Sequence, residues 1–180
     1  MNLRPRLPRS VLTAGALVLL TACAGDGFRP RPAPEPAKPV ELSRYLGRWY
    51  EIARYPNRFE KGCQAVTAEY ARRPDGLIAV TNTCRKGSAS GPVSRAEGRA
   101  KVVGGSGAKL KVSFFGPFFS DYWVLDRAED YSWAMVGDSS GRLFWILSRT
   151  PDPDRAALIR RAEALGYDPD RLILPEQPPA

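Results

Sequence analysis

The sequence GRWYEIAR at residues 47–54 sets the expected architecture, together with WILSR at residues 145–149 near the other end of the chain. Both read as short strands: the first has an aromatic residue, Trp49, near its start, and the second ends at Arg149. We expect the guanidinium group of Arg149 to lie over the indole of Trp49, a cation–π contact that stabilises by roughly 0.5–2 kcal/mol. This contact requires the first and last strands to be neighbours, which a closed barrel provides and an open meander does not.

Strand-like segments recur between these two ends, and clusters of Gly, Pro, Asp and Ser separate them. The expected strands lie at about residues 48–55, 65–72, 77–84, 94–102, 109–115, 121–126, 131–137 and 142–148. Such a series predicts an all-β fold, an eight-stranded antiparallel up-and-down β-barrel just wide enough to hold one small ligand. A two-sheet sandwich with exposed edges is the alternative.

The apolar period changes after the eighth strand. Apolar residues recur at helical spacing and predict one C-terminal α-helix at about residues 153–165. Asp152 is the expected N-cap and Gly166 the expected end of this helix. A single amphipathic helix must bury its apolar face, so we expect it to pack on the outside of the barrel, against Phe144 and Ile146.

The N-terminal segment indicates export. Three arginines precede an uncharged apolar run at residues 11–22, which is too short for a bilayer span of about 20 residues and reads as the core of a signal peptide at residues 1–22. The run ends in LTAC at residues 20–23, which resembles the bacterial lipobox, so Cys23 is expected to carry the lipid that anchors the chain. An ordinary signal peptide that contains a cysteine is the alternative.

Two further features of this region locate the domain. Ala24 rather than Asp follows Cys23, which implies the outer membrane rather than the inner one, with the chain facing the periplasm of a Gram-negative bacterium. Residues 23–40 include five prolines and are expected to form an extended tether of roughly 50 Å. The barrel with its helix is then expected at residues 41–176.

Composition excludes several function classes. The formal charge of +8 falls to +5 once the three arginines of the signal peptide are removed, because 24 basic residues then face 19 acidic ones. The charge is dispersed, so we expect no nucleic-acid partner and only loose attraction to anionic lipid head groups. The chain has no histidine, which excludes Ser–His–Asp and Cys–His catalytic sets, His-ligated haem and His-based zinc sites. No cofactor and no metal are expected.

Cys63 and Cys84 remain once Cys23 is assigned to the lipid. The turn sequence RPDG at residues 73–76 lies between them, and a hairpin about it brings the two cysteines nearly opposite each other, with a bulge or loop absorbing the offset. In an oxidising compartment this spacing favours a disulfide. Free thiols are the alternative.

Three short motifs and three longer segments match a known family. GRWY at residues 47–50 fits a GxW signature, SDY at residues 120–122 fits a second signature in which Ser replaces the usual Thr, and Arg149 fits a third. YEIAR at residues 50–54, VSFFGPF at residues 112–118 and WILSRTP at residues 145–151 extend the match. The chain thus resembles the lipocalins, and among them the lipoprotein lipocalins of the bacterial outer membrane. The signature residues are Gly47, Trp49, Asp121, Tyr122 and Arg149.

This resemblance implies binding rather than catalysis. It implies that a fatty acid or a lysophospholipid is carried or stored in the barrel lumen, for maintenance of the envelope, by a chain held at the membrane through Cys23. Whether the chain forms a homodimer stays open.

Alternation along the strands identifies the expected lumen residues. Glu51 and Ala53 share the face of Trp49, and Trp145 shares the face of Arg149. A carboxylate that points inward needs a partner, which for Glu51 is a tyrosine hydroxyl, a lumen arginine or a ligand head group. The expected ligand-binding residues are Glu51, Val66, Tyr70, Leu110, Val112, Phe114, Tyr122, Val124, Trp133, Met135 and Trp145.

Two other function classes stay open. A lipocalin-type enzyme acting on a lipophilic substrate is disfavoured by the tied thiols, the missing histidine and the single strong inward acid. A structural or interaction protein of the envelope would use its barrel exterior or its loops. The aromatic sequence FFGPFF at residues 114–119 is then a candidate to contact a partner, touch a membrane surface or gate the barrel mouth.

Overall fold

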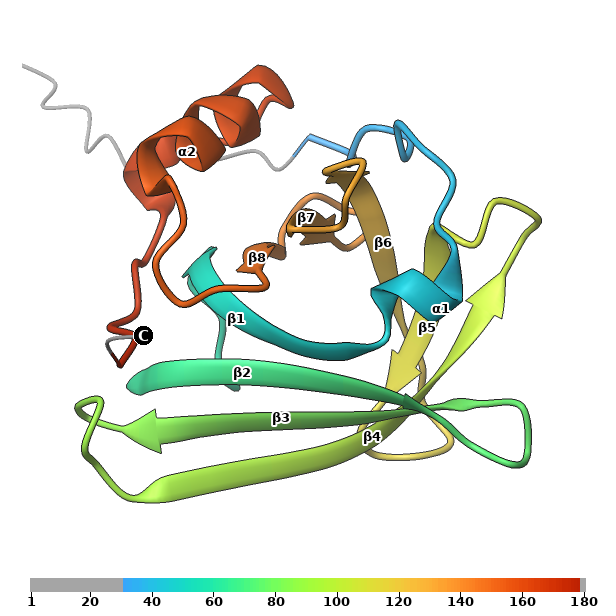
Figure 1. Cartoon of the computed structure of the whole chain (residues 1–180), viewed down its shortest axis with the longest axis horizontal. Helices are drawn as coiled ribbons and strands as arrows, with labels where there is room; N and C mark the ends of the chain where they lie inside the picture. Colours follow the sequence, from blue (N-terminus) through green and yellow to red (C-terminus); the bar gives the residue numbers. More distant parts are fainter. Residues whose placement is uncertain (1–30, 179–180) are drawn as a thin grey trace, which may run out of the picture.

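A computed structural model describes residues 31–178, and these residues form a closed barrel of eight antiparallel strands in chain order (Figure 1). The strands are β1 (Gly47–Arg54), β2 (Cys63–Arg72), β3 (Ile78–Lys86), β4 (Val93–Val103), β5 (Lys109–Ser113), β6 (Ser120–Arg127), β7 (Trp133–Gly137) and β8 (Phe144–Ser148). The helices are α1 (Leu42–Tyr45), α2 (Arg155–Ala164) and the 3-10 helix η1 (Pro169–Arg171). The barrel predicted from the sequence is confirmed, and each strand lies within two residues of its expected bounds.

The two ends of the barrel differ. Helix α1 and the β2–β3, β4–β5 and β6–β7 connections lie at one end, here called the closed end. The loops β1–β2 (55–62), β3–β4 (87–92), β5–β6 (114–119) and β7–β8 (138–143) lie at the other, the open end.

Apolar side chains pack on both faces of part of the barrel wall. The inner cluster includes Trp49, Leu110 and Val136, which point into the barrel. The outer cluster joins Ile146 of β8 to Leu158 of α2, together with residues of β1, β6 and β7. Helix α2 therefore covers the outside of the barrel, as its amphipathic sequence predicted. No helix within residues 31–178 is long and apolar enough to cross a bilayer.

Helix α2 is bounded by two local signals. The side chain of Asp154 caps the first turn by accepting a hydrogen bond from the Ala157 N–H at 2.9 Å. Gly166, with φ +90°, ends the helix in the left-handed conformation that glycine adopts most easily. The predicted N-cap, Asp152, was wrong by two residues, because Asp154 is the carboxylate within reach of a free N–H of the first turn.

The proline-rich segment at residues 31–40, here called the strap, lies along the outside of the barrel. The N–H groups of Ala33, Ala37 and Val40 donate to the carbonyls of Ser139, Leu125 and Ser106, at 3.2, 2.8 and 2.8 Å. The residues between these donors include prolines, which have no backbone N–H and so need no hydrogen-bond acceptor. The expected free tether is therefore wrong for residues 31–40, which are part of the folded domain, whereas the signal peptide and Cys23 lie outside the described residues.

Charged side chains hold the strap in the same place. Lys38 Nζ lies 2.9 Å from Glu129 Oε1 and 3.5 Å from Asp126 Oδ1. Arg127 donates to the Pro39 carbonyl at 2.7 Å.

The first hairpin contains the predicted disulfide. Cys63 and Cys84 are bonded, with their Cα atoms 5.4 Å apart. The β2–β3 register shifts between Gln64 and Thr67, where Ala65 has φ 47°, so a bulge absorbs the expected offset.

The C-terminal segment (residues 172–178) fills a gap in the wall at the open end. Strand β1 pairs with β2 over residues 47–50, and the two strands separate beyond that point. Ile173 then pairs with Arg54 of β1, and the carbonyl of Glu176 accepts from the Ala65 N–H at 2.7 Å. The side chain of Gln177 donates to the carbonyls of Glu51 and Val66, at 2.7 and 2.9 Å.

We expect Leu158→Ala to lower the free energy of unfolding by about 2–5 kcal/mol, because it leaves a cavity between α2 and the barrel. The matched control is Arg160→Ala in the same helix, whose exposed side chain predicts a change within about 0.5 kcal/mol. Urea unfolding followed by tryptophan fluorescence measures both. Equal losses in the two variants would contradict the packing of α2 through Leu158.

Candidate functional site

The closed end is held by Trp49 and Arg149. The Trp49 side chain is fully buried, and its Nε1–H donates to the Tyr45 carbonyl at 2.8 Å. The guanidinium carbon of Arg149 lies 3.7 Å from the Trp49 ring centroid, which is the contact expected from the sequence. Arg149 also donates to the carbonyls of Arg44, Leu46 and Arg48, at 2.8, 2.9 and 2.7 Å. These bonds fix α1 across the closed end, so this pair is structural.

Three tyrosines form a polar floor above this closure. The Tyr122 hydroxyl lies 2.7 Å from the hydroxyls of both Tyr45 and Tyr70. Burial raises the pKa of each hydroxyl well above its usual value, so all three stay neutral. The floor of the lumen therefore offers hydroxyl groups without a charge.

Apolar side chains pack in the barrel interior, here called the lumen, between this floor and the open end. Ala68, Leu110, Val112, Phe114, Val124 and Trp145 belong to the inner cluster or pack against it. The Phe114 ring passes over Gly98, where a Cβ atom would come within 2.8 Å of the ring. A side chain at position 98 would displace Phe114.

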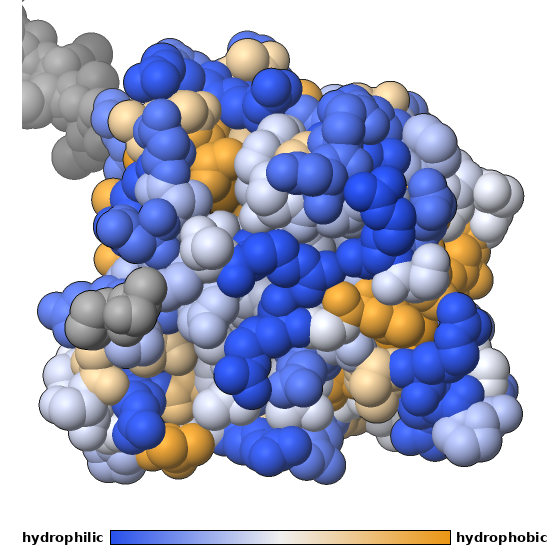
Figure 2. All heavy atoms as spheres, viewed as in Figure 1, coloured by the Kyte–Doolittle hydropathy of each residue, from blue (hydrophilic) through white to orange (hydrophobic). Residues whose placement is uncertain are grey.

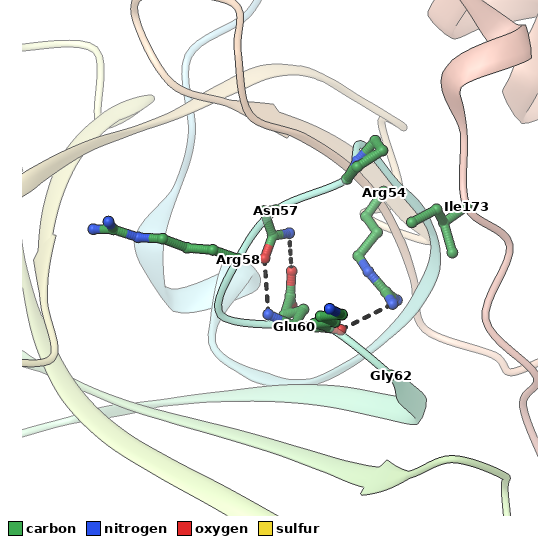
Figure 3. Close-up of a pocket in the computed structure, with 8 residues that line it drawn as sticks. Arg54, Asn57, Arg58, Glu60, Gly62 and Ile173 are labelled. Atoms are coloured by element: carbon green, nitrogen blue, oxygen red, sulfur yellow. Dashed lines mark hydrogen bonds between the residues drawn. The ribbon is translucent and has the colours of Figure 1, made fainter.

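Four residues form what we call the mouth cluster near the open end: Glu51, Arg54, Glu60 and Trp145. Arg54 Nη1 lies 2.6 Å from Glu51 Oε1, and its Nη2 donates to the Glu60 carbonyl at 3.2 Å (Figure 3). Trp145 Nε1 donates to Glu60 Oε2 at 2.9 Å, and the Glu60 N–H donates to Asn57 Oδ1 at 2.9 Å. The cluster joins β1, β8 and the β1–β2 loop.

The Glu51 carboxyl is 2% exposed and faces a positive and a negative group. Burial, followed by the negative charge of Glu60, raises its pKa well above the usual range, and the opposing effect of Arg54 is smaller. Glu51 therefore keeps its proton at pH values where an exposed glutamate has lost it.

The β1–β2 loop covers the mouth cluster. The Phe59 ring stacks on Trp145, with centroids 6.4 Å apart and an interplanar angle of 27°. A pocket of about 400 Å³ lies beneath the loop (Figure 3). It is lined by Arg54, Pro56, Asn57, Arg58, Glu60, Lys61, Gly62 and Ile173. This volume falls in the range of about 300–1,000 Å³ that is usual for small-molecule sites.

No group of three or more Cys, Asp or Glu side chains in residues 31–178 is placed to hold a metal ion. The chemistry of the site is that of an apolar lumen with a neutral polar floor and a charged mouth.

The model of the lipocalin-like domain family matches residues 40–177. The chain belongs to the lipocalin family. Among curated relatives, this lipocalin is 43% identical to the outer membrane lipoprotein Blc of Vibrio cholerae, over 94% of this chain and 99% of that protein. It is 38% identical to the outer membrane lipoprotein Blc of Escherichia coli K12, over 96% of this chain and 98% of that protein.

Solved structures show the same fold at lower identity. Insecticyanin from the tobacco hornworm Manduca sexta has a TM-score of 0.61 and 22% identity, over 83% of this lipocalin and 88% of that chain. The cockroach allergen Per a 4 has a TM-score of 0.60 and 19% identity, over 83% of this chain and 96% of that chain.

The structure brings most of the predicted site residues of the lipocalin to the lumen. Glu51 and Trp145 lie in the mouth cluster, and Val66 packs against the disulfide close to it. Tyr70, Leu110, Val112, Phe114, Tyr122 and Val124 face the inner cluster. That these residues contact a ligand stays a prediction. Asp121 lies outside the lumen, bonded to Lys111 at 2.9 Å and to the Ser139 hydroxyl.

Trp133, Met135 and Ala53 were wrongly predicted to face the lumen. Trp133 and Met135 pack in the outer cluster, and Arg161 of α2 lies over the Trp133 ring at 4.8 Å. Strand β7 is apolar on both faces because α2 covers its outside, so its sequence has no polar alternation to show which face is inner. Ala53 turns outward because a bulge between Glu51 and Ala53 shifts the parity of β1.

Sequence reasoning missed Arg54, Glu60 and Tyr45. The same bulge brings Arg54 to the inner side with Glu51, although strict alternation separates residues three apart. Glu60 and Tyr45 lie outside the strands, in a loop and in α1, where alternation carries no information.

We expect Glu51→Gln to change how stability depends on pH. A carboxyl whose pKa is raised by folding contributes stability that is fully present below the unfolded pKa of about 4.3 and is lost as pH rises through the folded pKa. The wild type should therefore lose stability relative to the variant as pH rises from 4 to 8. Urea unfolding from pH 3 to pH 8 measures the difference, with pH 3, where the Glu51 side chain is almost fully protonated in both the folded and the unfolded state, as the internal control. Parallel curves would contradict the raised pKa.

Proposed function

We propose that this lipocalin binds a single-chain lipid, a fatty acid or a lysophospholipid, in its lumen and carries or stores it at the outer membrane. The observation that carries the proposal is an apolar lumen that ends at a buried, charged mouth cluster beside a pocket of about 400 Å³. We place the attachment to the membrane at a lipid on Cys23, with the domain on the periplasmic side. The two relatives described above are outer membrane lipoproteins, which supports this location.

The lumen suits an acyl chain. Each Å² of apolar surface that enters contact with Leu110, Val112 and Val124 contributes about 25 cal/mol. The tyrosine floor and the closure by Trp49 and Arg149 limit how deep a chain penetrates.

The mouth suits the polar end of such a lipid. Arg54, Arg58 and Lys61 line the pocket beside a single carboxylate side chain, Glu60. Arg58 extends away from Arg54 and Ile173 in Figure 3, so its guanidinium group is not committed to the mouth cluster. A carboxylate or a phosphate in the pocket would meet cations that form charge-assisted hydrogen bonds.

The site supports binding better than catalysis. The two cysteines of the described chain are joined in a disulfide, and the chain has no histidine to act as a general base. The mouth carboxyls are held by Arg54, Asn57 and Trp145 rather than placed free in the lumen.

We expect Trp145→Ala to weaken binding of palmitate or lysophosphatidylethanolamine about tenfold, because the substitution removes apolar contact surface at the mouth and the stacking partner of Phe59. The matched control is Trp133→Ala, which removes the same side chain from the outer face and should leave the dissociation constant unchanged. Isothermal titration calorimetry measures both variants, and native mass spectrometry of the purified protein shows whether a lipid is retained and whether the chain is a monomer or a dimer.

Equal weakening in the two variants would overturn the assignment of the mouth. A wild-type chain that retains no lipid and binds neither probe would overturn the proposed function. A preference for the fatty acid or for the lysophospholipid in the same titrations identifies the lipid class.

A further inference from the structure

Exposed hydrophobic side chains gather at the open end of the barrel. Within residues 31–178, seven large hydrophobic side chains are exposed, and six of them lie at this end. Phe115 and Phe118 of the β5–β6 loop are 83% and 79% exposed, and the others are Phe59, Val93, Ile173 and Leu174. The seventh, Val102, lies near the other end of β4.

The side of the barrel seen in Figure 2 is mostly hydrophilic. Hydrophobic residues on that face form a few patches, the widest of them at α1. Large exposed apolar groups gathered in one region of a soluble surface mark a contact with another protein or with a membrane.

The strap shows which end of the barrel lies closer to the membrane anchor. Its first described residue, Arg31, lies against Gly141 of the β7–β8 loop, and Ala33 bonds to Ser139 of the same loop. Ser139 in turn bonds to Asp121, the second residue of β6 after the β5–β6 loop. The chain therefore runs toward its N-terminus from the open end.

The length of chain beyond Arg31 limits the distance to the anchor. Seven residues lie between Cys23 and Arg31, which makes eight steps along the chain, and a fully extended chain spans at most about 3.3–3.6 Å per step. The open end is therefore held within about 29 Å of a lipid attached to Cys23, whereas the closed end lies a barrel length further along the strap.

Cations surround the exposed hydrophobic groups. Arg31, Arg58, Lys61, Lys86 and Arg142 are exposed on the strap start or on loops and strand ends of the open end. The acids at this end are Glu60, Asp121, Asp138 and Glu176. Three of them are already bonded within the protein: Glu60 accepts from Trp145, Asp121 from Lys111, and Asp138 from the Leu143 N–H. Aromatic tips flanked by cations suit a surface of anionic phospholipids, where rings enter the interface and cations meet phosphates.

We propose that the open end docks on the bilayer through Phe115 and Phe118, with the strap holding the barrel in that orientation. The lumen mouth then faces the membrane, so that a lipid passes between bilayer and lumen without crossing water. The docking rests on the proposed lipid anchor at Cys23 but not on lipid binding in the lumen, whereas the transfer step rests on both.

The test uses the full-length lipidated chain in vesicles of phosphatidylethanolamine and phosphatidylglycerol whose acyl chains are partly brominated. Phe118→Trp places a fluorescent ring in the docking loop, and Val102→Trp places one at the exposed hydrophobic position near the closed end. After subtraction of the signal from the four native tryptophans, we expect bromine to quench the tryptophan at 118 at least twofold more than the tryptophan at 102. Equal quenching at the two positions would overturn the orientation.

A second variant tests the consequence for transfer. The double substitution Phe115→Ser and Phe118→Ser should slow the movement of lysophosphatidylethanolamine from vesicles into the lumen at least fivefold, while the dissociation constant measured with monomeric lysolipid in solution stays unchanged. An unchanged transfer rate would overturn the role of the loop. A chain that docks but binds neither lysolipid nor palmitate would refute the proposed function and leave the docking intact, so the two failures are distinguishable.

Discussion

The contact of Arg149, directly after β8, with Trp49 of β1 is the interaction on which the rest of the structure depends. The Arg149 guanidinium group covers the Trp49 indole and also donates to carbonyls of α1 and of the β1 start. No other side chain can make both sets of contacts. These contacts join β8 to β1 and hold α1 across the barrel. They close the barrel interior at this end, and the polar floor of Tyr45, Tyr70 and Tyr122 is built on that closure.

The fold was predictable from the sequence because its signals are local. Turn residues bound each strand, and the cysteine spacing about residues 73–76 matches the hairpin register within a single bulge. The helix was also predictable, since its apolar stripe is local, although its N-cap required knowing which carboxylate reaches the first turn. The strap was not: its contacts with Leu125 and Ser106 join residues far apart in sequence.

The candidate site was predictable where one face of a strand is polar and not where both are apolar. Leu110 and Val112 alternate with lysines, so their inward direction is evident from the sequence. Both faces of β7 pack against apolar clusters, so both carry apolar residues. The prediction for Trp133 and Met135 therefore depended only on counting alternate positions, and it assigned them to the wrong face. The pairing of Glu51 with Arg54 depends on a bulge, which leaves no signal in composition or period.

The strap also has a consequence for the order in which the domain assembles. Its partners, Ser106, Leu125 and Ser139, all follow it by more than sixty residues. The strap therefore gains these contacts only after β6 and the β7–β8 loop have formed. The segment that precedes the barrel in sequence is thus among the last parts of the domain to dock on it.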